Sequence, residues 1–401
     1  MPLRNGCEFM ESNNKRIYLS SPHMTGNEQK YIDMSFKTNW IAPLGPNVDL
    51  FEENISQYVG VNGALAVSSG TAAIHLALRL LDVKAGDRVF CSTLTFVASA
   101  NPILYQHAEP IFIDSEFDTW NMSPKALKKA FKDAKKEGNL PKAVIVVHLY
   151  GQIAKMDEIV EICNFYQVPI IEDAAESLGS IYKGRKSGTI GKFGVYSFNG
   201  NKIITTSGGG MLVSNTQEAL VKGKFLATQA RDNSPYYQHS ELGHNYRMSN
   251  ILAGIGIAQL TAIEERVEQK QAIFQRYVHE LSHIKEFVFM PEYQGTRHNR
   301  WLTTLFIDSE QPLFSPLELI QALEKENIEA RPIWKPMHLQ PLLNEFKYYP
   351  HSNHLSVSDH LFERGICLPS GTNMSKEEQT RVIQTIQSFI THKRKQKYIS
   401  T

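Results

Sequence analysis

Short apolar runs alternate with helical patterns from about residue 55 to residue 215. This alternation predicts a parallel sheet whose strands are joined by crossover helices. Several of the runs consist almost entirely of Val, Ile and Phe, as expected for strands covered on both faces. The predicted strands are Ala64–Val67, Arg88–Cys91, Pro110–Ile113, Ala143–His148, Val168–Glu172, Gly194–Phe198 and Met211–Val213. Between them, the pattern predicts helices at Thr71–Leu81 and Lys155–Phe165.

A different pattern begins at Asn250, where apolar residues recur at helical spacing and then give way to the charged segment 264–271. We predict one long helix here that bridges two domains. Beyond it, a smaller α+β domain is expected, and we place the boundary so that residues 15–265 form the large domain with an N-terminal segment and residues 266–401 form the small domain. The elements expected in the small domain are Trp301–Ile307, Ser315–Glu326, Ile328–Pro332 and Lys376–Thr391.

Composition narrows the class of ligand. The chain has 401 residues, with 42 Lys and Arg against 41 Asp and Glu. Such a balance does not favour nucleic acid or an anionic membrane as a partner, so small ligands are expected. The N-terminus contains no secretory apolar run, and no segment approaches the roughly 20 apolar residues of a membrane span. The cysteines lack a C-x-x-C pair, which favours the reducing cytoplasm; they are Cys7, Cys91, Cys163 and Cys367.

Three motifs carry candidate chemistry. Ser68–Ala72 follows a strand and opens a helix, so its free amides and Gly70 could hold a phosphate, although a simple N-cap is an equal alternative. Asp173 ends an apolar strand, where it could meet a ligand or cap a helix. Lys202 follows Ser197–Asn201 and precedes β-branched residues, which suits an ordered amine that forms a Schiff base; a surface lysine is the alternative.

Together the three motifs indicate pyridoxal phosphate. This cofactor needs an anchor for its phosphate, a carboxylate for its protonated pyridine and an amine that tethers its aldehyde. The combination is far more specific than any one motif. The sequence therefore predicts a pyridoxal-phosphate enzyme.

The order of these motifs also resembles the DegT/DnrJ/EryC1/StrS family of sugar aminotransferases. The resemblance is carried by SSGTAA, EDAAESLG, SFNGNK with its trailing glycines, and GHNYRMSNI, and it extends to IYLSSPHMTGNE, NWIAPLGP and RPIWKPMHLQP. It is closest to members that make 4-amino sugars, such as the bacillosamine precursor, from UDP-linked 4-keto-6-deoxy-N-acetylglucosamine. The resemblance implies the α/β fold of aspartate aminotransferase (fold type I), glutamate as donor, and a homodimer with shared active sites.

The same resemblance assigns roles to residues. It implies that Lys202 tethers the cofactor and shuttles the proton, and that Asp173 pairs with the pyridine nitrogen. Phe96 would lie over the ring, with core packing as the alternative. Glu176 stands near the ring hydroxyl where many relatives have His or Gln, so it would have to be protonated or bridged by a donor. The remaining assignments are phosphate binding by Gly70, Thr71, Ala72, Ser197 and the second subunit's Asn245, and substrate binding by His338.

Other readings compete with this one. No G-x-G-x-x-G motif follows an early strand, which disfavours a nicotinamide enzyme. His351, His354 and His360 cluster loosely, and a surface loop explains them better than a metal site. The remaining rival is a non-catalytic regulator of the same fold that only binds pyridoxal phosphate. Retention of Lys202 together with Asp173 argues for the enzyme.

Overall fold

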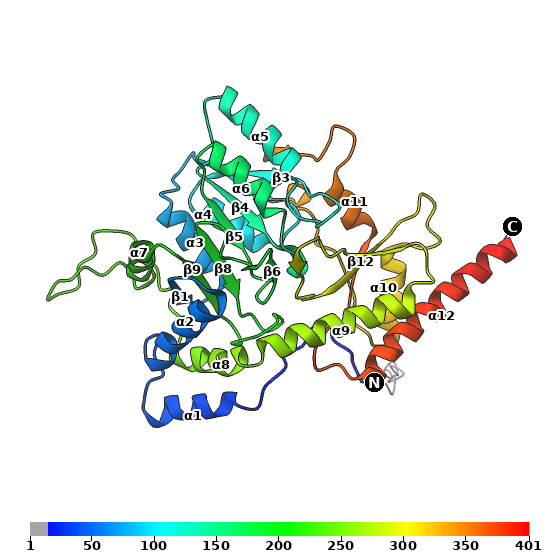
Figure 1. The fold of residues 1–401 in the computed structure, drawn as a ribbon, viewed down its shortest axis with the longest axis horizontal. Helices are drawn as coiled ribbons and strands as arrows, with labels where there is room; N and C mark the ends of the chain where they lie inside the picture. Colours follow the sequence, from blue (N-terminus) through cyan, green and yellow to red (C-terminus); the bar gives the residue numbers. More distant parts are fainter. Residues whose placement is uncertain (1–14, 401) are drawn as a thin grey trace, which may run out of the picture.

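The computed structural model describes residues 15–400 and is built around an eight-stranded sheet (Figure 1). All neighbouring strands are parallel except at β9, which runs antiparallel to both of its neighbours. In sheet order the strands are β1 (Gly63–Val67), β9 (Gly210–Ser214), β8 (Phe193–Ser197), β5 (Ile170–Asp173), β4 (Ala143–Val147), β2 (Arg88–Ser92), β3 (Glu109–Ile113) and β14 (Tyr348–Tyr349). The parallel sheet predicted from the sequence is confirmed for all of these strands except β9, which makes the sheet mixed.

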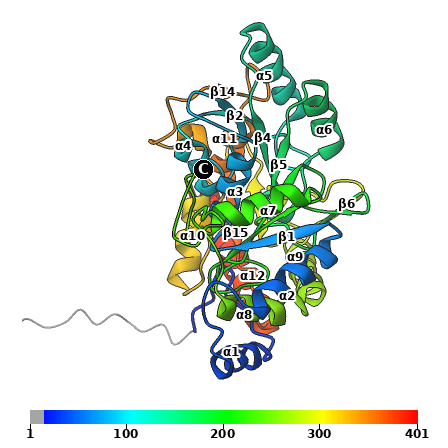
Figure 2. The same cartoon turned by 90° about the vertical axis from the view of Figure 1, so that its left-hand side faces the viewer.

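Helices cover both faces of this sheet (Figures 1 and 2). Successive strand residues point to opposite faces, so Ile145 packs in one core cluster while its neighbour Val144 packs in the other. One face is covered by α3 (Gly70–Leu80), α4 (Asn101–Tyr105) and α7 (Gln217–Ala227). The other is covered by α2 (Pro46–Val59), α5 (Pro124–Lys136), α6 (Met156–Phe165) and α8 (Asn250–Leu260), with α1 (Glu28–Lys37) packed outside α8.

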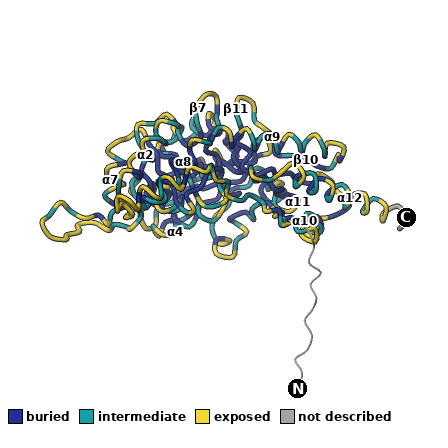
Figure 3. The backbone as a smooth tube through the Cα atoms, turned by 90° about the horizontal axis from the view of Figure 1, so that it is seen from below, coloured by how far each residue is buried: buried dark blue, intermediate teal, exposed yellow. Residues whose placement is uncertain are grey.

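The second domain is a smaller α+β unit with its own core. Its antiparallel sheet has the order β10 (Phe287–Phe289), β12 (Thr303–Ile307), β15 (Gly365–Leu368) and β13 (Arg331–Pro332). Its helices are α9 (Ile263–Leu281), α10 (Pro316–Lys325), α11 (Val357–Arg364) and α12 (Lys376–Ser400). A third, three-stranded sheet consists of β11 (Thr296–Arg297), β6 (Ile181–Tyr182) and β7 (Arg185–Lys186). Buried backbone runs through both domains, while the end of α12 extends into solvent (Figure 3).

Two predicted helices differ from the structure. The long helix expected from Asn250 is broken at Thr261 and Ala262 into α8 and α9. The Thr261 hydroxyl donates to the Ala258 carbonyl, 2.7 Å away, and so occupies a backbone acceptor at the end of α8. The last helix continues to Ser400 rather than ending at Thr391. Its basic residues near this end pair with acids of the small domain, since Lys393 contacts Glu318.

Two segments cross the expected domain division at residues 265 and 266. Ile17 pairs with Ile328 and belongs to the core cluster of the small domain. Conversely, β14 comes from the C-terminal part of the chain but pairs with β3 in the large sheet. The division between residues 265 and 266 therefore stays a prediction. The N-terminal segment, which was assigned to the large domain, packs on the small domain.

Two observations concern the expected reducing environment and the expected absence of a membrane span: the state of the cysteines and the character of the helices. Cys91, Cys163 and Cys367 are free and buried, while Cys7 lies outside the described residues. Of the helices within residues 15–400, none combines the length and the apolar character needed to cross a bilayer.

Candidate active site

A cavity of about 370 Å³ lies at the carboxyl ends of β2, β5 and β8. This is where ligands bind in open α/β sheets. The loops after these strands and the start of α3 supply most of its lining, and Trp301 and Trp334 close it from the second domain. The predicted site residues that line it are Gly70, Thr71, Phe96, Asp173, Glu176, Ser197 and Lys202. Residues from widely separated motifs thus meet in one place.

The start of α3 forms one end of the cavity. Ser69 caps the helix, because its hydroxyl accepts from the Ala72 amide at 3.0 Å. The two readings of this motif therefore coexist, since capping uses Ala72 while Gly70 and Thr71 still face the cavity. A Cβ at Gly70 would lie 3.3 Å from Ser197 Cβ, so the glycine relieves a tight contact between the start of α3 and Ser197. Helix amides beside a serine hydroxyl suit an anion such as phosphate.

Asp173 lies at the end of β5 and is almost fully buried. Its Oδ2 accepts from the Ser99 hydroxyl at 2.6 Å, and its Oδ1 accepts from the Ala175 amide at 3.2 Å. These donors fix the orientation of the carboxylate at the cavity wall. Ser99 is a site residue that sequence reasoning missed. Its position after β2, at the carboxyl edge of the sheet, was the available signal.

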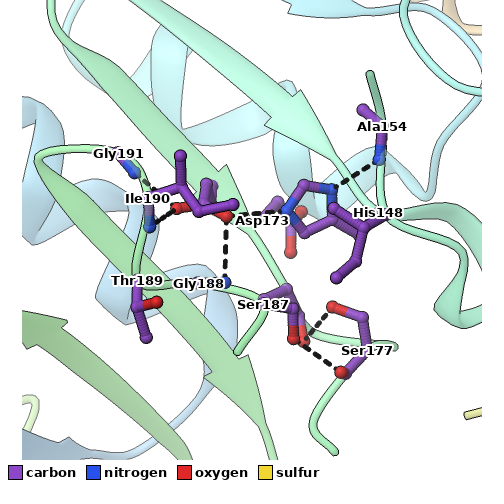
Figure 4. A network of polar contacts seen from close by, with 12 residues as sticks. His148, Ala154, Asp173, Ser177, Ser187, Gly188, Thr189, Ile190 and Gly191 are labelled. Carbon is purple, nitrogen blue, oxygen red and sulfur yellow. Dashed lines mark hydrogen bonds and ion pairs between the residues drawn. The ribbon is translucent and has the colours of Figure 1, made fainter. Parts of the chain in front are cut away.

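A polar network behind Asp173 holds this end of β5 (Figure 4). The neighbouring Glu172 is completely buried, and its carboxylate accepts from His148 Nε2 at 2.8 Å. The His148 amide in turn donates to the Asp173 carbonyl at 3.1 Å. A buried carboxylate is tolerated only when it is well bonded. The further donors to Glu172 are the amides of Gly188 (2.9 Å), Ile190 (2.5 Å) and Gly191 (2.5 Å).

Lys202 projects into the cavity rather than into solvent, since its side chain is only 13% exposed. Its Nζ lies 3.5 Å from Glu176 Oε1 and 4.1 Å from the centroid of the Trp301 ring. A surface lysine, the alternative reading, is thereby excluded. The amine is placed to react with an electrophile bound in the cavity.

Glu176 is the second buried carboxyl of the site. Its Oε2 accepts from the Tyr150 amide at 2.7 Å. Burial raises the pKa of Glu176 above its usual value, although the charge of Lys202 acts in the opposite direction. A raised pKa favours the protonated acid, which is one of the two states expected of an acid beside a ring hydroxyl; the other is an acid bridged by a donor.

Aromatic rings form the remaining wall. Phe96 is 52% exposed and its ring centroid lies 5.3 Å from that of Trp334, so the core-packing alternative for Phe96 is excluded. Tyr150 stacks between Trp334 and Trp301, with centroids 6.2 Å apart on each side. The Trp334 indole N–H is buried and has no hydrogen-bond partner within residues 15–400. Both tryptophans come from the second domain, and the local sequence gave no signal for them.

Three predicted residues do not line this cavity. The amide of Ala72 is used by Ser69, as described above. His338 Nδ1 lies 2.7 Å from the Thr93 hydroxyl, its Nε2 lies 3.0 Å from Asp359, and its ring stacks on Tyr348. Both ring nitrogens therefore have protein partners, which suits a histidine that caps a loop. The roles of Ala72 and His338 stay predictions.

Asn245, the third of these residues, lies in a separate surface cavity of about 760 Å³. Trp40 and Pro43–Pro46 line the same cavity, so the segment NWIAPLGP, which contributes to the family resemblance, lies beside Asn245. Arg247 fixes this region, donating to Glu52 at 2.6 Å and to the Ala66 carbonyl at 2.8 Å, so its role is architectural. The loop between α7 and α8 projects from the body of the molecule at this side (Figure 1).

Two of the three histidines considered for a metal have other partners, and the third, His354, is exposed. His351 Nδ1 lies 2.9 Å from the Ser123 hydroxyl, and His360 packs edge-on against Phe117 and Phe306. In the part of the chain that the structure describes, no three His, Cys, Asp or Glu side chains are grouped to hold a metal ion.

The main cavity fits pyridoxal phosphate. Its groups are a helix start with a serine hydroxyl for the phosphate, a fixed carboxylate for the pyridinium, and an amine for the aldehyde. The opening at Gly70 supports this fit, because an added Cβ would crowd Ser197 there.

Comparison with known proteins agrees with this chemistry. The chain is 62% identical over 372 residues to EpsN of Bacillus subtilis, which is named as a pyridoxal phosphate-dependent aminotransferase. The match covers 93% of this chain and 95% of EpsN. It is 34% identical over 378 residues to GDP-perosamine synthase of Caulobacter vibrioides, covering 94% and 98%. Sugar aminotransferase activity is assigned by name to Spr1654 of Streptococcus pneumoniae, whose pyridoxal-phosphate form has a TM-score of 0.85 at 25% identity, covering 93% of this chain and 98% of that one.

The model of the DegT/DnrJ/EryC1/StrS aminotransferase family matches residues 22–387. This span includes both domains and every lining residue of the main cavity. The chain belongs to the DegT/DnrJ/EryC1/StrS aminotransferase family and is an enzyme that uses pyridoxal phosphate.

Proposed function

We propose that the enzyme moves an amino group from L-glutamate to the keto carbon of a nucleotide-linked 4-keto-6-deoxy sugar. The observation that carries the proposal is the meeting of Lys202, Asp173 and the α3 start in one cavity. The resemblance to transaminases of the bacillosamine type favours UDP-linked 4-keto-6-deoxy-N-acetylglucosamine as acceptor. The product would enter polysaccharide or glycan synthesis, and the free buried cysteines suit the cytoplasm.

The residues divide the work of binding. Gly70, Thr71 and Ser197 hold the phosphate, and Asp173 holds the pyridinium in the orientation set by Ser99. When bound, pyridoxal phosphate supplies an electron sink that stabilises charge at a carbon losing its proton. Phe96, Trp301 and Trp334 exclude water from the reacting atoms and give the sugar an apolar wall.

Lys202 carries the proton transfer in the proposed reaction. In its neutral form, Nζ takes the proton from the α-carbon of glutamate, and in the second half-reaction it delivers a proton to C4 of the sugar. Glu176 lies 3.5 Å from this amine and accepts from the Tyr150 amide, so it restrains Lys202 on one side. Trp301 restrains it on the other.

The homodimer is also part of the proposal. Asn245 lies outside the main cavity of its own chain, in the surface cavity beside the projecting loop. In a two-fold dimer the same surface faces the partner, so Asn245 could reach the partner's phosphate site. Each site would then be complete only in the dimer.

The first experiment separates the enzyme from a non-catalytic regulator. Lys202→Ala should abolish turnover with glutamate and the keto sugar while the protein still folds, because no other amine lies in the lining. Lys186→Ala is a matched control, since Lys186 is partly buried but pairs with Glu264 outside the cavity. Absorbance follows conversion of the bound cofactor from its aldehyde to its amine form by glutamate. A wild-type cofactor that glutamate leaves unchanged would favour the regulator.

The second experiment identifies the acceptor. We would incubate the enzyme with glutamate and 4-keto or 3-keto sugars linked to UDP, dTDP or GDP, and record products by mass spectrometry. The proposal expects the amino product from the UDP-linked 4-keto-6-deoxy-N-acetyl sugar at the highest kcat/KM. Preference for a GDP-linked or a 3-keto sugar would refute that substrate assignment and leave the aminotransferase activity intact.

A further inference from the structure

Lys270 on α9 is a buried amine that the proposed reaction does not use. It is 2% exposed, and within residues 15–400 no carboxylate forms an ion pair with it. Its Nζ instead donates to the Trp301 carbonyl at 2.8 Å and to the Ser20 hydroxyl at 3.1 Å. Burial lowers the pKa of Lys270 to about 7. An amine buried without an acid is costly to folding, so these two contacts require a reason.

Both partners of Lys270 converge on one carbonyl oxygen. The Trp301 indole N–H donates to the Asn201 carbonyl at 2.8 Å, and the Ser20 hydroxyl donates to the same oxygen at 3.2 Å. This carbonyl belongs to the peptide unit that leads into Lys202. The Trp301 ring also lies 4.1 Å from Lys202 Nζ. Hydrogen bonds therefore connect Lys270 to the peptide unit that precedes Lys202, and the Trp301 ring connects it to the Lys202 amine.

We propose that Lys270 is a positioning residue. By fixing Ser20 and Trp301, it holds the backbone and the amine of Lys202 in place. The hydrogen bonds join three parts of the chain: the N-terminal segment, the helix between the domains, and the loop before β12. The Lys202 amine must approach its reaction partner within a few tenths of an ångström, and displacement by about 1 Å can lower a rate by about 100-fold. The inference rests on the proposed role of Lys202.

Arg266 offers a matched control on the same helix. It lies one turn before Lys270 and is also buried. Its guanidinium contacts Gln269 and the Met24 carbonyl, and it has no hydrogen bond to Ser20, Trp301 or Asn201 among the described contacts. Loss of this cation disturbs the packing of α9 without touching the path to Lys202.

The test compares Lys270→Met with Arg266→Met in the full-length enzyme loaded with pyridoxal phosphate. For Lys270→Met we expect kcat to fall at least tenfold while KM for glutamate changes less than threefold, because the substrate contacts remain. The visible circular dichroism of the bound cofactor should weaken, since its tether is less fixed. Arg266→Met should retain kcat and the dichroism band. Unchanged kcat and dichroism in Lys270→Met, or equal losses in both variants, would overturn the proposal.

Ser20→Ala keeps the test decisive if Lys270→Met does not fold. It removes one branch of the path, so kcat should fall by a smaller factor with the same spectral change. Where both variants fold, their double variant should lose no more than Lys270→Met alone, because the two act through one carbonyl. Normal kcat and dichroism in Ser20→Ala, or losses that multiply in the double variant, would contradict it. Turnover retained in Lys202→Ala would instead refute the proposed function itself.

Discussion

At the scale of single residues, the two buried carboxyls of the cavity have different surroundings. Asp173 accepts from a hydroxyl and an amide, at 2.6 Å and 3.2 Å, which fixes the orientation of its carboxylate. Glu176 has one amide donor, and burial raises the pKa of its carboxyl. Carboxyls whose environments differ in this way take different roles at one site. Asp173 suits its proposed role as the acceptor for the pyridinium, and Glu176 suits a neutral or bridged acid.

This difference predicts the behaviour of Glu176→Gln. Glutamine resembles the protonated acid and can still accept from the Tyr150 amide, so kcat should stay within about threefold of the wild type, less than about 1 kcal/mol in barrier. The raised pKa means that the wild type loses the protonated form as pH rises through it. Its pH–rate profile should therefore contain an ionisation above the usual glutamate range that the variant lacks. A loss beyond about 100-fold would show that the carboxylate is required, and identical profiles would show that ionisation of Glu176 does not affect the rate.

The residues that sequence reasoning missed reach the site through tertiary packing rather than through a local motif. The motif containing Lys202 could be recognised because its chemistry is contiguous in the chain. Trp301 lies about a hundred positions further on and reaches the cavity only through interdomain packing, where it contacts Lys202. Lys270 looked like part of a charged, solvated face, yet it is fully buried. A single sequence indicates where a helix forms from the spacing of its apolar residues, but it does not show which parts of the chain pack against each face of that helix.

At the scale of elements, the start of α3 combines a structural and a functional role. Ser69 caps α3 and lines the cavity, whereas Ser123 caps α5 far from it, accepting from the Ala126 amide at 3.2 Å. Ser69→Ala and Ser123→Ala should each lower the free energy of unfolding by about 1 kcal/mol, measured by urea denaturation. Only Ser69→Ala should weaken retention of pyridoxal phosphate, measured by dialysis and absorbance, because it loosens the amides at the phosphate. Equal retention in the two variants would refute the phosphate site at α3.

Strand prediction succeeded where burial on both faces makes the pattern unambiguous. All seven predicted strands of the large sheet are present, with ends shifted by at most two residues. The eighth strand, Tyr348–Tyr349, was not predicted because two residues carry no periodic signal and their partner, β3, lies more than 200 positions earlier. The break between α8 and α9 was missed for a similar reason, since both segments continue one helical pattern.

At the scale of the whole molecule, the separation of Asn245 from the main cavity predicts complementation between inactive subunits. Asn245→Asp places a carboxylate where the proposal puts the partner's phosphate, so repulsion should empty the site. Lys202→Ala removes the reacting amine from the subunit that carries it. In a mixed dimer one site combines both defects, while the other has the intact Lys202 of one chain and the intact Asn245 of its partner. If subunits reassort at random from equal amounts, half the dimers are mixed and one of their two sites works. Activity should therefore recover to about a quarter of the wild-type value.

Refolding the two variants together and separately, with glutamate turnover as the readout, measures this recovery. Activity in the mixture no greater than the sum of the separate variants would mean that each cavity is complete within its own chain, and Asn245 would then lose its proposed role.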